Sequence, residues 1–176
     1  VIVHEGDVHT VIDALGDKTT LSPNRIDALD GVMQIKFIRE PFRLASRDRK
    51  SDDTIIEFSN GVKVGGANRP VFMVGPCSVE EDYEGLLEVA TAAKELGCQF
   101  LRGGAFKPRT SPYDFDGLGE KALKYLAQAR EATGLLVVTE LMDVEDLDLV
   151  CDYADVIQVG ARNMQNYNLL KDMGQV

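Results

Sequence analysis

The sequence predicts an α/β fold built on a parallel β-sheet, and three observations lead to this prediction. From residue 70 onward, short apolar runs alternate with stretches of helical periodicity. The apolar runs are continuous, as expected of parallel strands covered by helices. Polar or charged residues follow each run, at the strand ends where such proteins place functional groups.

Four strand–helix units are expected between residues 71 and 176. The strands are predicted at 71–74, 98–101, 135–139 and 156–159. The helices are predicted up to residue 96, behind a capping box of Ser78 and Glu81, and at 119–133, 143–152 and 164–172. Four units are half of an eight-unit TIM (β/α)8 barrel, and we therefore predict its first four βα units. The alternative is a doubly wound open sheet, but no glycine-rich dinucleotide fingerprint follows the first strand.

The first 70 residues predict a smaller α+β segment. A strand is expected at 8–15, a helix from Ser22-Pro23 to Gly31, and a second strand at 32–38. This order resembles the latter part of a small ferredoxin-like domain. Asn60-Gly61 then predicts a hairpin, which we interpret as a plug on the bottom of the barrel. The predicted domains are a partial ferredoxin-like domain (1–44), a linker with the hairpin (45–70) and the first half of the barrel (71–176).

Net charge and cysteine content exclude several classes of protein. The 176 residues carry a formal net charge of −10, which argues against a general nucleic-acid surface. No apolar run approaches the ~20 residues of a membrane helix, so no membrane partner is expected. Three cysteines without a disulfide-framework spacing predict a reducing, cytoplasmic setting. Because the sequence starts at Val1 and stops at Val176, just after a predicted helix, we expect a piece of a longer chain.

The stretch from residue 101 to 119 carries the strongest functional signal. Gly103 and Gly104 allow close backbone approach and positive φ, and Pro108 stiffens the path. Arginine and lysine bind phosphate or carboxylate groups, and hydroxyls complete such a shell. In an acidic protein, this local excess of cations predicts a site for a small polyanion rather than a solvated basic loop. The candidate residues are Arg102, Lys107, Arg109, Thr110 and Ser111.

Three further candidates follow the other predicted strands. Cys77 follows the first strand, and on the residues alone a small buried hydrophobe is favoured over a thiolate nucleophile or a metal ligand. Glu140 follows the third strand, where it could bind a cation, a catalytic water or an arginine, or cap a helix. Arg162 follows Gly160-Ala161 after the fourth strand, where an arginine can bind a phosphate.

Three motifs, in order, resemble those of 3-deoxy-D-arabino-heptulosonate 7-phosphate (DAHP) synthases. They are GPCSVE at 75–80, RGGAFKPRTSPY at 102–113 and QVGARNMQN at 158–166. The resemblance is to the short type related to 3-deoxy-D-manno-octulosonate 8-phosphate (KDO8P) synthase. It implies a transferase that condenses phosphoenolpyruvate with erythrose 4-phosphate, the first step of the shikimate pathway of aromatic amino acid biosynthesis. It also implies a homo-oligomer, a tetramer in the whole protein, with a feedback-control domain before the barrel.

The resemblance also implies a role for each candidate residue. Arg102 and Lys107 would contact the carboxylate of phosphoenolpyruvate, and Lys107 would also transfer a proton. Arg162, beside Ala161, would hold the phosphate of the same substrate. Glu140 would lie near the substrate and hold the catalytic water. The aldose phosphate would be held by Arg109, Thr110 and Ser111, with Pro108 shaping the path of the loop.

A divalent metal ion is the cofactor that the resemblance implies. Cys77 matches a metal ligand of the family, and Mn, Fe, Zn and Co are not distinguished. The family's other ligands, a histidine and two carboxylates, come from later strands and would lie beyond Val176.

Two other functions stay open at this point. KDO8P synthase shares the barrel and the phosphoenolpyruvate chemistry, but its loop usually reads Lys-Ala-Asn-Arg-Ser where this sequence has Lys-Pro-Arg-Thr-Ser. The other is a non-catalytic half-barrel that binds a phosphorylated ligand or a partner chain.

Overall fold

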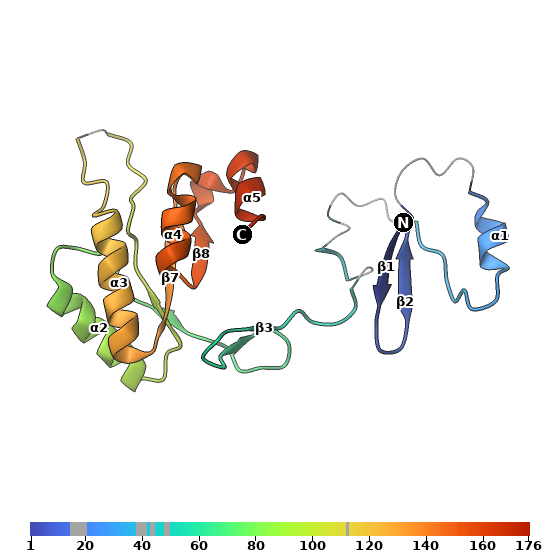
Figure 1. The fold of residues 1–176 in the computed structure, drawn as a ribbon, viewed down its shortest axis with the longest axis horizontal. Helices are drawn as coiled ribbons and strands as arrows, with labels where there is room; N and C mark the ends of the chain where they lie inside the picture. Colours follow the sequence, from blue (N-terminus) through green and yellow to red (C-terminus); the bar gives the residue numbers. More distant parts are fainter. Residues whose placement is uncertain (15–20, 38–41, 43–44, 48–49, 112) are drawn as a thin grey trace. The chain divides into compact units, whose positions relative to one another are not determined.

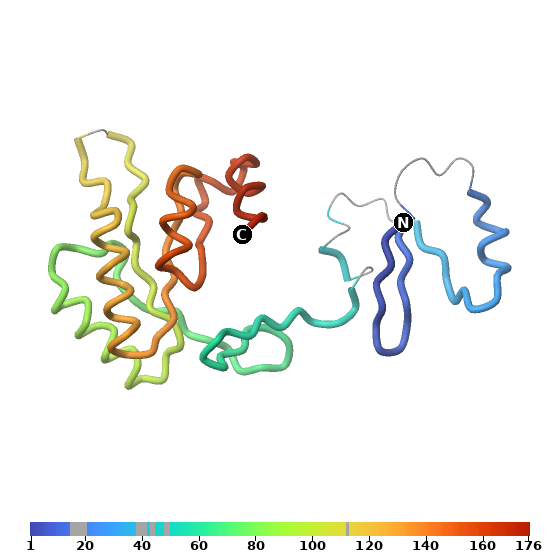
Figure 2. The backbone as a smooth tube through the Cα atoms, viewed as in Figure 1, coloured from blue at the N-terminus to red at the C-terminus, as the bar shows by residue number. Residues whose placement is uncertain are grey.

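The computed structural model describes residues 1–14, 21–37, 42, 45–47, 50–111 and 113–176. The chain divides into two compact units, Val1–Ile55 and Ile56–Val176. The ribbon in Figure 1 and the tube in Figure 2 follow the chain through each unit. All of the predicted site residues belong to the second unit.

The first unit contains a two-stranded hairpin and one short helix. β1 (Ile2–Glu5) pairs antiparallel with β2 (Thr10–Asp13). In the turn between them, the N–H of Gly6 donates to the carbonyl of His9 at 3.1 Å. α1 (Pro23–Asp27) begins after Ser22, as predicted.

The predicted second strand of this unit is wrong over its described part. Residues 32–37 are irregular and pair with no described strand, while residue 38 lies outside the described residues. The strand expected at 8–15 is confirmed only as β2, and its partner is β1, which sequence analysis missed. Closing a short turn loses less chain entropy than pairing strands across a helix. The described residues therefore do not form the β-α-β order of a ferredoxin-like domain.

The second unit opens with the hairpin predicted at Asn60-Gly61. β3 (Ile56–Glu57) pairs antiparallel with β4 (Lys63–Val64). Gly61 has a φ of +84°, which few residues other than glycine adopt readily. The Asn60 side-chain oxygen accepts the N–H of Val62 at 3.1 Å, so the two turn residues fix the hairpin for different reasons.

Four strands form the predicted parallel sheet, in the order β5-β6-β7-β8. They are β5 (Met73–Val74), β6 (Phe100–Arg102), β7 (Leu136–Leu141) and β8 (Val156–Val159). Every neighbouring pair is parallel, so the four carboxyl ends lie along one edge. The register places Glu140 beside Gln158 at that edge.

Helices follow each strand, as the alternating pattern predicts. They are α2 (Tyr83–Glu95), α3 (Glu120–Thr133), the 3-10 turn η2 (Val144–Asp146) with α4 (Leu147–Tyr153), and the 3-10 turn η3 (Ala161–Asn163) with α5 (Tyr167–Met173). Among these described helices, none combines the length and the apolar character needed to cross a membrane.

The capping box predicted for the first of these helices is wrong. The N-cap of α2 is Asp82, whose carboxylate accepts the N–H of Gly85 at 3.0 Å. A carboxylate next to the first turn satisfies a free N–H and also suits the positive end of the helix dipole. Ser78 instead precedes the helix, and its hydroxyl is buried without a hydrogen-bond partner among the described residues.

The sheet is covered differently on its two faces. Leu101 and Val137 pack with the buried residues of the helices, including Leu123 and Leu126 of α3. The opposite face carries the small cluster of Phe100, Leu136 and Val138, and the hairpin residues Phe58, Val62 and Val64 pack against it. The rings of Phe58 and Phe100 meet edge to face at 5.2 Å. The hairpin therefore packs on this face of the sheet, and its interpretation as a barrel plug stays a prediction.

We predict that Phe58→Ala lowers the free energy of unfolding by about 2 kcal/mol, because Phe58 is only partly buried against the sheet. Urea unfolding of the purified protein measures the change. Phe37→Ala is the matched control, since Phe37 is 63% exposed and should change stability little. Equal effects of the two substitutions would show that the hairpin does not stabilise the sheet.

Candidate functional site

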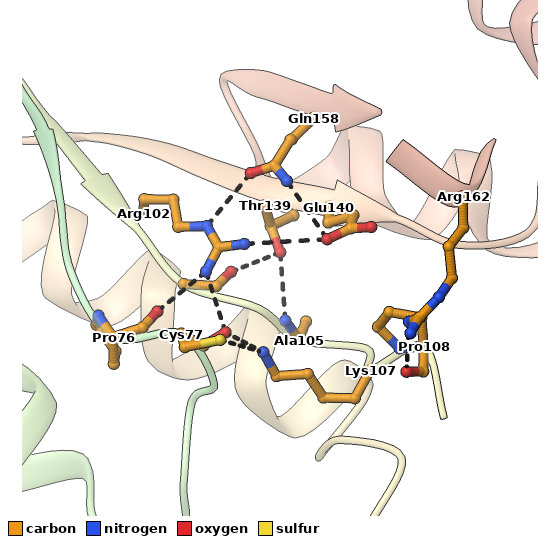
Figure 3. A network of polar contacts seen from close by, with 11 residues as sticks. Pro76, Cys77, Arg102, Ala105, Lys107, Pro108, Thr139, Glu140, Gln158 and Arg162 are labelled. Carbon is orange, nitrogen blue, oxygen red and sulfur yellow. Dashed lines mark hydrogen bonds and ion pairs between the residues drawn. The ribbon is translucent and has the colours of Figure 1, made fainter. Parts of the chain in front are cut away.

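The predicted residues of three strand ends meet at the carboxyl edge of the sheet. Cys77 follows β5, Arg102 ends β6, and Glu140 lies near the end of β7. Figure 3 shows these side chains directed toward one another, with Gln158 of β8 between two of them. A parallel sheet brings residues far apart in sequence to one edge, which is why such edges carry functional sites.

Arg102 is the centre of this arrangement. Its Nε donates to Oε1 of Gln158 at 3.3 Å, and its Nη1 donates to the carbonyls of Cys77 at 3.0 Å and Pro76 at 3.4 Å. Its Nη2 lies 3.9 Å from Oε2 of Glu140. The Arg102 and Glu140 side chains are 23% and 13% exposed. Because both side chains are partly buried, each charge is stable there only while the other compensates it.

Glu140 is held from two further directions. The amide Nε2 of Gln158 donates to its Oε2 at 3.3 Å. A Cβ on Gly160 would overlap with its Oε1, so a larger residue there would displace the carboxylate from its present position. The structure places an arginine, one of the partners considered for Glu140, beside its carboxylate. Gly160 therefore leaves the space that the Glu140 side chain occupies.

Lys107 and Cys77 form the second part of the site. Lys107 Nζ donates to the carbonyl of Cys77 and lies 3.1 Å from its Sγ. The hydrogen bond from Lys107 Nζ to Sγ, then the charge of Lys107 and the hydrogen bond from Arg102, lower the pKa of the Cys77 thiol. Cys77 is exposed, so its interpretation as a buried hydrophobe is wrong. Cys77 lies in the loop between β5 and α2, at the carboxyl edge of the sheet.

A buried hydroxyl holds the start of the loop after β6. Thr139 is fully buried, donates to the carbonyl of Gly103 at 2.7 Å and accepts the N–H of Ala105 at 3.3 Å. A Cβ on Gly104 would overlap with the Cys77 carbonyl, so close approach is confirmed there. Neither Gly103 nor Gly104 has a positive φ, and that part of the prediction is wrong.

The outer part of the loop holds the remaining candidates. Arg109 donates its Nε to the carbonyl of Phe115 at 2.7 Å, and the Ser111 hydroxyl accepts the N–H of Tyr113 at 3.3 Å. Thr110 is exposed. The structure therefore places these three residues on the loop itself, outside the Arg102 network.

Arg162 joins the fourth strand end to this loop. It lies in η3, next to Ala161, and both residues are exposed. Its Nη1 donates to the carbonyl of Pro108 at 2.8 Å. Figure 3 shows the guanidinium reaching across to the loop. The predicted phosphate residue thus contacts the predicted aldose-phosphate loop directly.

Sequence analysis missed Gln158 and Thr139. Both are polar residues inside largely apolar strands, which is a signal because buried polar groups need partners. Each lies one or two residues before a strand end. That position and polarity together would have identified them.

The described residues do not complete a metal site. No group of three or more His, Cys, Asp or Glu side chains suited to hold an ion occurs among them. The Cys77 thiol is exposed and its pKa is lowered, so it could supply one sulfur ligand to a metal ion.

We predict that iodoacetamide alkylates Cys77 at lower pH than Cys151. Both thiols are exposed, but Lys107 lowers the pKa of Cys77, whereas burial and then the nearby Asp148 and Asp152 raise that of Cys151. Peptide mass spectrometry between about pH 6 and 9 gives both profiles. Lys107→Met should move the midpoint of the Cys77 profile to higher pH and leave that of Cys151 in place. The control Lys124→Met should move neither midpoint. A Cys77 profile unmoved by Lys107→Met would contradict the assignment.

Comparison with known proteins agrees with the motifs. The sequence matches the DAHP synthetase I family over residues 53–176. Phospho-2-dehydro-3-deoxyheptonate aldolase of Thermotoga maritima is 44% identical over 172 residues, covering 98% of this chain and 50% of that protein. 2-Dehydro-3-deoxyphosphooctonate aldolase of Cupriavidus necator is 34% identical over 105 residues, covering 54% of this chain and 36% of that protein.

Solved structures extend the comparison to the fold. The crystal structure of T. maritima DAHP synthase matches with a TM-score of 0.73 at 43% identity, covering 98% of this chain and 50% of that chain. A truncated form of the T. maritima synthase matches with a TM-score of 0.66 at 46% identity, covering 76% and 47%. The chain spans about half the length of the relatives it matches. The predicted resemblance is confirmed, and the chain belongs to the DAHP synthetase I family.

Proposed function

We propose that this chain provides the substrate-binding strand ends of a DAHP synthase. Such an enzyme condenses phosphoenolpyruvate with erythrose 4-phosphate and releases inorganic phosphate. The observation that supports the proposal most is the meeting of Arg102 and Lys107 at one sheet edge, with Arg162 reaching the adjoining loop. Two anionic substrates require cations within reach of both.

We also propose that the sheet is the first half of a (β/α)8 barrel. Four consecutive parallel strands in sequence order, with helices packed on one face, support this architecture. The hairpin at the amino-terminal part of the other face is consistent with a barrel bottom. A tetrameric homo-oligomer, a cytoplasmic setting and a regulatory role for residues 1–44 stay predictions.

The proposed substrate contacts follow from the two groups of cations. Arg102 and Lys107, in the inner network, bind the carboxylate of phosphoenolpyruvate. Arg162 binds its phosphate, with the backbone of Ala161 nearby. The aldose phosphate binds on the outer loop, to Arg109, Thr110 and Ser111, and Pro108 sets the direction of that loop.

The proposed chemistry uses two of these residues. C3 of phosphoenolpyruvate attacks the aldehyde carbon of erythrose 4-phosphate and forms the new carbon–carbon bond. Lys107 donates a proton to the aldehyde oxygen, which becomes a hydroxyl. This attack leaves C2 electron-poor, and water hydrogen-bonded to Glu140 adds there and passes one proton to the carboxylate. The C2–O bond to phosphate then breaks, and the new C2 hydroxyl gives its proton to the departing phosphate and becomes the keto group. The contacts with Arg102 and Gln158 hold the Glu140 carboxylate in position to accept a hydrogen bond from this water.

Cys77 is proposed as one donor to a divalent ion, among Mn, Fe, Zn and Co. Its exposed thiol and lowered pKa support this role, since metals bind the thiolate. The related synthases that carry this motif are the basis for the assignment.

We predict that Arg162→Ala weakens binding of phosphoenolpyruvate by about ten- to a hundredfold, because a charge-assisted contact is lost. Arg109→Ala should weaken the binding of erythrose 4-phosphate by a similar factor and change the affinity for phosphoenolpyruvate much less. Isothermal titration calorimetry on the purified protein gives both dissociation constants. The control Arg47→Ala, in the first unit, should change neither. Equal losses for both substrates in both variants would contradict the two subsites.

KDO8P synthase is the alternative, because the C. necator relative carries the corresponding name. We predict that erythrose 4-phosphate binds at least about tenfold more tightly than arabinose 5-phosphate when phosphoenolpyruvate is present, since the Lys-Pro-Arg-Thr-Ser loop is of the DAHP synthase type. Competition calorimetry measures the ratio. Preference for arabinose 5-phosphate would favour the alternative. Binding of phosphoenolpyruvate with no affinity for either aldose phosphate would favour a non-catalytic module.

A further inference from the structure

We propose that Arg162 couples the two anion subsites, so that occupation of one strengthens the other. This inference rests on the proposed function and adds a link between its two substrates. It begins from the hydrogen bond of Arg162 Nη1 to the carbonyl of Pro108, at 2.8 Å. The two residues are 54 positions apart in sequence, and they connect η3 with the loop after β6.

Arg162 can hold a phosphate without releasing the loop. A guanidinium carries five N–H donors in a planar fork. Among the described residues, Pro108 is the only hydrogen-bond partner of Arg162, and the residue is exposed. Nε and Nη2 thus stay available for bidentate contact with a phosphate. The carbonyl and the phosphate then bind different edges of one side chain.

The loop is built so that the position of Pro108 matters. Its base is fixed by the bridge between Phe106 and Gly117 and by the N–H of Lys107, which donates to the carbonyl of Asp116 at 2.6 Å. Pro108 follows this fixed base and has a restricted φ. Arg109 comes next, so the direction of the Pro108 peptide unit determines where the predicted aldose-phosphate arginine begins.

The sign of the coupling follows from these contacts. A phosphate that immobilises Arg162 also immobilises its contact with Pro108, and the loop loses less freedom when the second anion binds. By linkage, the second anion must strengthen the first by the same factor. One hydrogen bond of this type corresponds to about three- to tenfold in affinity. Direct repulsion between two anions acts in the opposite direction.

Calorimetry with and without the other substrate tests this coupling. Erythrose 4-phosphate is titrated into the purified protein, free and saturated with phosphoenolpyruvate, and the order is then reversed. We expect about three- to tenfold tighter binding in both orders. Arg162→Lys keeps the charge but has one nitrogen, which cannot span the carbonyl and a bidentate phosphate. Its coupling should fall below about twofold.

A second variant changes the loop and leaves Arg162 intact. Pro108→Gly frees the backbone at the contact, so coupling should also fall below about twofold. Lys124→Met, at an exposed pair with Glu120, is the control and should keep full coupling. Circular dichroism checks that each variant is folded.

The outcomes separate the two proposals. Failure of both substrates to bind would overturn the proposed function. Binding of both with no mutual effect, or with mutual weakening, would overturn the coupling alone. Full coupling in Arg162→Lys and Pro108→Gly would also overturn it, because the effect would then come from elsewhere.

Discussion

The site depends on the contacts of one arginine, Arg102, which links the ends of all four strands of the sheet. Arg102 leaves β6 and contacts backbone carbonyls after β5, the carboxylate of Glu140 on β7 and the amide of Gln158 on β8. Removing either charge would leave the other partly buried without its partner, which is costly. The parallel register makes these contacts possible, and Gly160 leaves the space that Glu140 occupies.

The other cations of the site have no carboxylate partner among the described residues. Lys107, Arg109 and Arg162 each donate to a backbone carbonyl, and Lys107 also contacts the thiol of Cys77. A carbonyl fixes direction through its dipole but carries no net charge, so the positive charge stays available to a ligand. In a chain with a net charge of −10, this arrangement concentrates positive potential where the proposed substrate anions bind.

The sheet and most site residues were predictable because strong local signals agree. Apolar runs mark the strands, Asn60-Gly61 marks the hairpin, and Gly134 ends α3 with a φ of +71°. The pairing of β1 with β2 was not predictable, since residues 2–5 carry no distinct pattern and the choice of partner depends on chain entropy. The cap at Asp82 is a local contact with Gly85, but Ser78 and Glu81 matched the capping-box pattern and were preferred. Gln158 could have been noticed as a polar residue in a strand, but its two partners lie on other strands and could not be identified from the sequence.

The central claim is that this strand-end cluster binds phosphoenolpyruvate, and a crystal structure with that ligand tests it most directly. The account predicts the carboxylate beside Arg102 and Lys107 and the phosphate on Arg162, with the Arg162–Pro108 hydrogen bond retained. Ligand density at another surface of the protein, or a reversed ligand with its phosphate on Arg102, would contradict the account.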